Sequence, residues 1–340
     1  MRSGSRRARP GRKIAAPLLA AVVLLAAGAH LWLNTNLFGR DEVCGGLVST
    51  GTVQTVLGSG RVSDRNGLDD RPRERLDFTC TVESTSFLTG SDTGRLSISV
   101  SRERGDFPFT DNGRWPSPAR MSFVSGEATG AVGADHGWVL LPGSCTTADG
   151  PAVVEGYAPR GSDRVALILL LTEVAGKAAE RASCAAERPL VAPDTVPAPP
   201  KPRQVGDDAV CGLTGLVFPG RPGDRDAATE RVQDGTGPTW SCEVEGHAVY
   251  SVTRERRLVA GITASPGFSA QPRVANRQVS GFDDRHVVAD CGGVPTYFSL
   301  ELGQEYTSAA GAPGTPRIQA LFTDFVDVAG KRFGCSAQAP

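Results

Sequence analysis

The sequence of 340 residues is long enough for two domains or one large one, and its formal net charge is -1. With 40% hydrophobic and 21% charged residues, 41 glycines and 24 prolines, the composition is typical of turn-rich globular domains. It excludes a coiled coil, a polytopic transporter and a wholly disordered chain, but it indicates no particular chemistry.

The N-terminal part combines a basic tail with a long apolar stretch. Residues 1–13 carry six basic and no acidic side chains, which leaves 30 basic and 37 acidic residues in the rest of the chain. Residues 14–33 hold no charged side chain when His30 is neutral, and a helix of that length spans about 30 Å, the thickness of the apolar part of a bilayer. We therefore expect a transmembrane signal anchor at 14–33, with the tail in the cytoplasm and the following residues outside.

A cleaved signal peptide is the alternative interpretation. Ala27-Gly28-Ala29 has the small-residue form of a cleavage site, and a cut after Ala29 would give a secreted protein. The apolar stretch continues to Leu33, which favours an uncleaved anchor and a single-pass protein of the plasma membrane. Both interpretations export the remainder of the chain.

All eight cysteines lie on the exported side, where disulfide bonds persist. No Cys-x-x-Cys spacing occurs, so a thioredoxin-like redox motif and a zinc ribbon both lack their usual signature. Within each group of four cysteines three pairings are open from the sequence. We expect first with second and third with fourth, which would hold each terminal helix to a neighbouring strand: Cys44–Cys80, Cys145–Cys184, Cys211–Cys242 and Cys291–Cys335.

The sequences around the cysteines indicate that one domain is present twice. Four segments recur in the same order: Val43–Leu47 with Val210–Leu213, Phe78–Glu83 with Trp240–Glu245, Ser99–Arg104 with Ser251–Arg256, and Val174–Lys177 with Val328–Lys331. This is the pattern of a tandem pair of homologous domains rather than of a solenoid, which needs three or more units.

A proline-rich segment separates the two copies. Six prolines lie between residues 189 and 202, a composition that favours extended polyproline geometry and a semi-rigid linker. We place the first extracytoplasmic repeat at 34–188, the linker at 189–206 and the second repeat at 207–340. Each repeat is large enough to bury a core.

Each repeat is predicted to be an α+β unit. After the first cysteine, apolar residues up to Leu57 suit a short helix that ends at Gly58. Alternating or apolar patterns predict strands at 78–82, 96–101, 138–141 and 153–157, with counterparts at 241–244, 248–253, 286–289 and 296–302. Apolar residues at helical spacing in 317–328 predict a C-terminal helix there and, by correspondence, at 164–174. The expected fold is an antiparallel sheet with a helix at either end and two disulfides, repeated twice.

The Cys-Gly-x-Leu opening, the cysteine near Phe or Trp on a strand and the closing cysteine on a helix resemble small exported four-cysteine α+β domains of actinobacteria. Such domains occur in uncharacterised lipoproteins, and something similar forms the extracellular sensor domain of mycobacterial serine/threonine kinases. Four lysines among 36 basic residues fit a high-GC genome of that kind. The chain departs from both groups because it has no lipobox cysteine and no cytoplasmic kinase. The resemblance implies a sandwich that binds or senses something at the cell surface, and no catalytic residues.

Recognisable catalytic and nucleotide-binding motifs are absent from the sequence: there is no G-x-S-x-G elbow, H-E-x-x-H, Walker A loop or G-x-G-x-x-G. The residues Phe282–Arg285 before one histidine are interpreted as a turn. The exported histidines are scattered, and they are His136, His247 and His286. We therefore expect no catalytic residue, no cofactor and no metal.

The most distinctive polar feature is an Arg-Glu-Arg sequence at a strand end in both repeats. One interpretation is a charged sheet edge that discourages edge-to-edge pairing. The other is contact with a partner or an anionic ligand, because arginine presents a planar fork of donors. The candidate contact residues are Arg102, Glu103, Arg104, Arg254, Glu255 and Arg256. Because the exported part is net acidic, a nucleic-acid partner is not expected.

Together these patterns favour a non-catalytic, membrane-anchored extracytoplasmic protein of the cell envelope with a binding, sensing or structural role. Its expected partners are the membrane, through residues 14–33, and a cell-wall component or another envelope protein. The alternative is an exported hydrolase with an unrecognised active site, which would need polar side chains that converge in a pocket.

Overall fold

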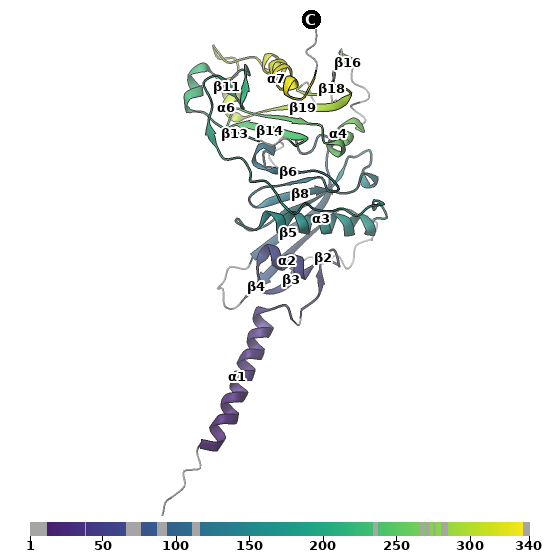
Figure 1. The fold of residues 1–340 in the computed structure, drawn as a ribbon, viewed down its shortest axis with the longest axis vertical. Coiled ribbons are helices and arrows are strands. Elements are labelled where there is room, and N and C mark those ends of the chain that lie inside the picture. Colours follow the sequence, from purple (N-terminus) through teal and green to yellow (C-terminus); the bar gives the residue numbers. More distant parts are fainter. Residues whose placement is uncertain are drawn as a thin grey trace, which may run out of the picture.

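Figure 1 shows the fold of the chain in a computed structural model. The structure describes residues 12–37, 39–65, 76–86, 94–110, 116–233, 237–265, 268, 273–274, 277–279 and 285–335. Within these ranges the side chains of residues 12–18, 33–34, 273–274 and 277–279 are not described. Most of the predicted cytoplasmic tail, residues 1–11, lies outside the described residues.

Helix α1 (Arg12–Asn34) covers the predicted anchor at 14–33. In Figure 1 it extends away from the rest of the molecule as a single rod. Its large apolar side chains are exposed from Leu19 to Trp32. Among the residues that the structure describes, no helix is both long enough and apolar enough to span a membrane.

The first repeat is built on an antiparallel seven-stranded sheet in the order β3-β4-β5-β9-β8-β7-β6. Its strands are β3 (Arg61–Arg65), β4 (Phe78–Thr85), β5 (Gly94–Arg102), β6 (Ser122–Val124), β7 (Gly130–Val132), β8 (His136–Leu140) and β9 (Ala152–Tyr157). The other elements are the pair β1 (Glu42–Val43) and β2 (Val48–Ser49), the helices α2 (Thr50–Leu57) and α3 (Arg164–Arg181), and the 3-10 turns η1 (Pro118–Arg120) and η2 (Gly143–Cys145).

The second repeat has an antiparallel eight-stranded sheet in the order β10-β13-β14-β15-β19-β18-β17-β16. Its strands are β10 (Arg203–Gln204), β13 (Thr229–Val232), β14 (Thr239–Val244), β15 (Ala248–Thr253), β16 (Arg273–Val274), β17 (Arg277–Val279), β18 (His286–Cys291) and β19 (Val294–Leu302). The other elements are β11 (Ala209–Val210), β12 (Leu213–Thr214), η3 (Pro222–Ala227), α4 (Arg256–Thr263), α6 (Gln304–Ala309) and α7 (Ile318–Arg332). From β13 to β16 the strand order repeats that of the first sheet, as expected for a duplicated domain.

The expected opening helix forms in the first repeat but not in the second. In the first, Ser49 caps α2, and its hydroxyl accepts a hydrogen bond from the backbone N–H of Thr52. In the second, the stretch after Cys211 contains Pro219 and Pro222 among several glycines and forms only the turn η3. The predicted helix at the start of the second repeat is therefore wrong, because proline interrupts the hydrogen bonding of a helix interior.

The two sheets face each other, with α3 and α7 on their outer sides and α4 in the core that the two repeats share (Figure 1). Val139 of β8 belongs to the apolar core beneath α3, whereas its neighbour Trp138 belongs to a separate core shared with the second repeat. In β19, Phe298 packs under α7, and Tyr297 faces the shared core. Because neighbouring strand residues point to opposite faces, each sheet is buried on both sides where the repeats meet.

The proline-rich linker packs against the first repeat rather than standing free as a spacer. Ala192 is buried in the core of that repeat. The carbonyl of Pro197 accepts hydrogen bonds from Ser122 Oγ at 2.7 Å and from Arg164 Nη1 at 2.9 Å. Strand β10 lies inside the range assigned to the linker and pairs with β13, so the second sheet begins before residue 207.

The four disulfide bonds follow the expected pairing and leave no free cysteine among the described residues. They are Cys44–Cys80, Cys145–Cys184, Cys211–Cys242 and Cys291–Cys335. In each repeat the first bridge joins the opening turn to a strand of the main sheet, β4 or β14, and the second bridge holds the segment that follows the C-terminal helix.

Candidate functional site

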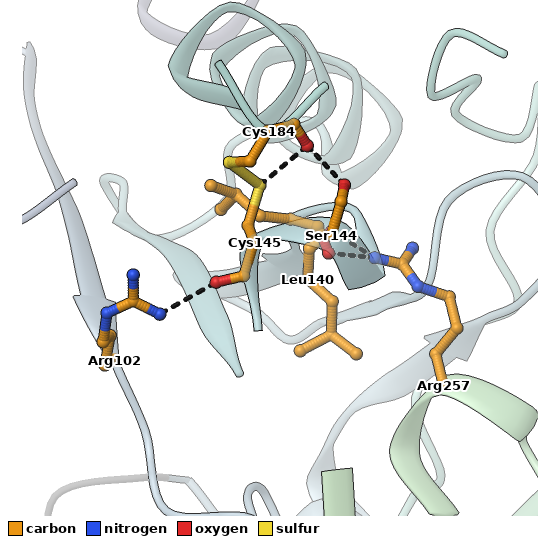
Figure 2. The surroundings of a disulfide bond; sticks show 7 residues. Arg102, Leu140, Ser144, Cys145, Cys184 and Arg257 are labelled. Atoms are coloured by element: carbon orange, nitrogen blue, oxygen red, sulfur yellow. Dashed lines mark hydrogen bonds between the residues drawn. A yellow bond between two sulfur atoms is a disulfide. The ribbon is translucent and has the colours of Figure 1, made fainter. Parts of the chain in front are cut away.

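The first arginine of each Arg-Glu-Arg sequence binds the backbone beside the second disulfide of its own repeat. Arg102, at the end of β5, donates from Nη1 to the carbonyl of Cys145 at 2.8 Å (Figure 2). Arg254 donates to the carbonyl of Phe333, two residues before Cys335, and its guanidinium lies 5.3 Å from the centre of the Phe333 ring. These two arginines therefore have equivalent structural roles in the two repeats.

The remaining residues of the first motif lead into the boundary between the repeats. Glu103 is buried and accepts a hydrogen bond from Ser101 Oγ at 2.7 Å. Arg104 donates hydrogen bonds to both carboxylate oxygens of the fully buried Asp106, from Nε to Oδ1 at 2.7 Å and from Nη2 to Oδ2 at 2.6 Å. Asp106 Oδ2 lies 3.8 Å from Nδ1 of His286 in the second repeat. Through Arg104, the motif therefore holds the buried carboxyl of Asp106 close to the second repeat.

The second motif leads into helix α4, which packs on the first repeat. Glu255 precedes α4, and its Oε1 accepts a hydrogen bond from Thr129 Oγ1 of the first repeat at 3.3 Å. Arg256 is exposed, and the described residues provide no hydrogen bond or ion pair to its side chain. The prediction that these six residues contact a partner stays a prediction, but five of them already have contacts within the chain.

Arg257 was not singled out by the sequence. Its Nη2 donates to the carbonyls of Leu140, at 3.1 Å, and of Leu141 in the first repeat. Figure 2 shows Arg102 and Arg257 on opposite sides of the segment that carries Cys145. The available signal was the Arg256-Arg257 doublet, because the first repeat has glycine after its corresponding arginine.

A cavity of about 290 Å³, which we call the seam pocket, lies where the two repeats and the linker meet. Its walls come from β6, the linker, the ends of β13 and β14, and the start of α4. The apolar part includes Phe123, Val124, Pro197, Val232 and Leu258. The pocket is therefore a product of the packing between repeats and belongs to neither repeat alone.

Three polar side chains of the seam pocket, those of Ser122, Gln233 and Thr239, have partners inside the protein. Ser122 donates to Pro197, and Gln233 Nε2 donates to the carbonyls of Pro118 and Met121 at 3.0 and 2.8 Å. The hydroxyl of Thr239 is 2.7 Å from that of Thr253. Because these groups are already paired, the pocket presents mainly apolar surface.

A second cavity of about 650 Å³, the arginine cleft, lies along the other side of α4. It is lined by Arg256 and Arg257, by small residues of α4 and by the segment around Leu140 and Leu141. Glu255 borders both the seam pocket and the arginine cleft. Helix α4 therefore separates an apolar cavity from a positively charged one.

Two groups of side chains have the spacing of a metal site, but their cysteines are bonded to each other. They are Cys44, Asp64 and Cys80, and Cys211, Glu230 and Cys242. A disulfide has no thiolate to coordinate a metal. The carboxylates instead accept hydrogen bonds from the backbone N–H groups of Cys44, at 2.7 Å, and Cys211, at 2.6 Å, whose φ angles are 54° and 60°. These carboxylates hold an uncommon left-handed turn at the start of each repeat.

Beyond His30 in α1, the described histidines lie in three separate places. His136 Nε2 is 3.0 Å from Oε1 of Glu155, and both residues are buried in the first sheet. His286 Nε2 is 3.0 Å from Oε1 of Glu301, and Nδ1 of His247 is 3.0 Å from the carbonyl of Glu245. Residues 282–284, interpreted above as part of a turn, lie outside the described residues. None of these histidines lines the seam pocket or the arginine cleft.

No protein-family model, no curated protein and no solved structure matches the chain. The resemblance to exported actinobacterial domains accordingly stays a prediction.

Proposed function

We propose that the protein is a non-catalytic, membrane-anchored binding protein of the cell envelope, with both repeats outside the cytoplasm. The observation that carries this proposal is the seam pocket, which the two repeats and the linker build together. The proposed ligand is a small apolar molecule, or the apolar part of a larger envelope component, that enters this pocket.

The extracytoplasmic location is supported by the covalent structure. Four disulfides in a chain without free cysteines among its described residues indicate folding in an oxidising compartment. The basic tail before residues 14–33 favours an anchor with its N-terminus in the cytoplasm. The segment proposed as the anchor lies within one continuous helix, α1.

The size and lining of the seam pocket support an apolar ligand. A volume of about 290 Å³ leaves room for several water molecules. Water in such a pocket would find few hydrogen-bonding groups, because much of the lining is apolar and the side chains of Ser122, Gln233 and Thr239 are paired within the protein. Replacing that water by an apolar group is therefore favourable.

The alternative of an exported hydrolase needs an accessible nucleophile with a neighbouring base. The titratable side chains that line the two cavities are Glu255, Arg256 and Arg257. The pairs His136–Glu155 and His286–Glu301 have the chemistry of acid–base groups, but both histidines are buried elsewhere. Binding is thus better supported than hydrolysis.

The experiment is a titration of the full chain, in detergent micelles, with the neutral dye N-phenyl-1-naphthylamine, followed by dye fluorescence. Ala198 is exposed on the linker wall of the pocket, so Ala198→Trp should fill the pocket without disturbing a core. Ala186→Trp, also at an exposed position, adds the same side chain away from the pocket lining.

We expect saturable binding by the wild type and by Ala186→Trp, and loss of the saturable signal in Ala198→Trp. Dye that enters the micelles contributes equally to all three samples. Equal saturable binding by both variants, or no saturable signal in the wild type, would refute the seam pocket as the ligand site.

A further inference from the structure

We propose that the arginine cleft binds an oxyanion, a carboxylate or phosphate group, through Arg256 and Arg257. This site is separate from the seam pocket and does not depend on the proposed apolar ligand. The inference rests on the cavity, on the unmet bonding capacity of Arg257 and on the exposure of Arg256.

In the guanidinium of Arg257, Nη2 makes hydrogen bonds with the protein and Nη1 makes none with the described residues. Nη2 donates to the carbonyls of Leu140 and Leu141, which fixes the side chain against the first repeat. Nη1 is buried and has no hydrogen-bond partner among the described residues. A buried N–H group without an acceptor is destabilising because its desolvation is not compensated, so an anion that bonded Nη1 would relieve that cost.

The charge of Arg257 is also unmatched in the described structure. Arg120 and Arg203 have carboxylate partners, Glu243 at 2.7 Å and Glu230 at 3.0 Å. No carboxylate of the described residues lies within ion-pair distance of Arg257. Burial lowers the pKa of Arg257, and the charge of nearby Glu255 opposes this effect. A desolvated cation facing a cavity favours an anion in that cavity.

Arg256 and the start of α4 add to the positive character of the cleft. Helix α4 begins at Arg256, and the side chain of Glu255 makes no capping hydrogen bond to its first turn. Glu255 is the one acidic residue among the described residues that line the cleft, and its Oε1 accepts a hydrogen bond from Thr129. Two arginines against one glutamate leave a net positive charge, and their forked donors suit an oxyanion.

The ligand chemistry is tested by isothermal titration calorimetry of the full chain in detergent micelles. Inorganic phosphate and acetate are the two probes, with chloride at matched ionic strength as the reference. We expect at least one oxyanion to bind saturably. The anion that binds with the higher affinity, phosphate or acetate, identifies the class of ligand. If neither gives saturable heat beyond chloride, the proposal is overturned.

The site is tested by placing a carboxylate in the cleft. Ala260 is exposed, lines the cleft and follows Arg256 by four residues, so the side chains of Ala260→Glu and Arg256 can meet on one face of α4. We expect Ala260→Glu to abolish anion binding and to raise the melting temperature, whereas Ala260→Gln, of nearly the same size, should retain binding. Equal anion binding by these two variants would contradict the proposal.

A substitution of Arg256 provides a second test that does not disturb the packing of Arg257. Arg256→Gln should lower the affinity for the anion about tenfold, the loss expected for one charge-assisted hydrogen bond. Arg160→Gln, at an exposed arginine outside the cleft lining, should leave the affinity unchanged. Ala198→Trp should also retain anion binding, so failure of the seam pocket and failure of the arginine cleft are distinguishable.

Discussion

Arg120 of the first repeat and Glu243 of the second form a two-pronged ion pair between the repeats. Nε is 2.7 Å from Oε2, and Nη2 is 2.7 Å from Oε1. Hydrogen bonding to Glu243 raises the pKa of Arg120, although burial opposes the effect. The pair lies where η1 rests on β13, β14 and β15, so it fixes the orientation of the two sheets.

We expect Arg120→Gln to lower the free energy of unfolding by about 1–3 kcal/mol, because buried Glu243 loses both of its charge-assisted bonds. Urea unfolding of the full chain measures this change. Arg160→Gln, which removes one member of an exposed pair with Asp135, should change stability by less than about 0.5 kcal/mol. Equal effects of the two substitutions would show that the ion pair does not hold the repeats together.

Tyr250 is fully buried under α7, and its hydroxyl has no hydrogen-bond partner among the described residues. Burial, with a smaller effect from Asp324, raises the pKa of this hydroxyl far above its usual range. We expect Tyr250→Phe to leave thermal stability unchanged or to increase it by about 1 kcal/mol, because it removes a desolvated polar group.

Tyr306→Phe is the matched control for that substitution. The hydroxyl of Tyr306 donates to the carbonyl of Pro316 at 2.9 Å. Its removal should cost about 1 kcal/mol, the net value of a typical hydrogen bond. If Tyr250→Phe were the more destabilising of the two, the buried hydroxyl of Tyr250 would have to possess a strong partner.

Glu173 of α3 should make stability depend on acidity. Burial raises the pKa of this carboxyl. Hydrogen bonds from Thr52, Lys177 and the backbone of Ser49, together with the charge of Lys177, lower the pKa by more than burial raises it, so the pKa lies below its usual value. The stabilisation is therefore present above the pKa of the unfolded chain and is lost as the pH falls through the folded pKa.

The measurement is urea unfolding of the wild type and of Glu173→Gln from about pH 7 to about pH 3. We expect the wild type to be more stable at neutral pH by about 1 kcal/mol or less, since solvent screens a partly exposed carboxyl. The difference should shrink in acid. If the difference in stability between the two proteins grew in acid, folding would have to raise the pKa of Glu173 instead of lowering it.

Mass spectrometry of the non-reduced protein from native membranes should show four disulfides, two within each repeat, and an intact N-terminus. Such a result supports the uncleaved anchor at residues 14–33. Cleavage near Ala29 would instead give a secreted protein, and bridges between the repeats would overturn the arrangement of two separately bridged domains.

The sequence was sufficient for features that depend on neighbouring residues or on the comparison of the two copies. The alternation through Leu96–Ser101 predicted β5, and the matching segments around Cys80 and Cys242 placed a cysteine on a strand in each repeat. The prediction failed where the copies differ locally, because Pro219 and Pro222 replace the residues that form α2 in the first repeat.

The packing of the repeats was decided by tertiary structure. Trp138 and Val139 are adjacent and apolar, and no local pattern shows that Val139 lies in the core under α3 whereas Trp138 lies in the core shared with the second repeat. The sequence separates Arg257 from Leu140 by more than a hundred residues, so its half-satisfied guanidinium could not be anticipated. Periodicity reports which side of an element is apolar, whereas the surface that covers it depends on how distant parts of the chain fit together.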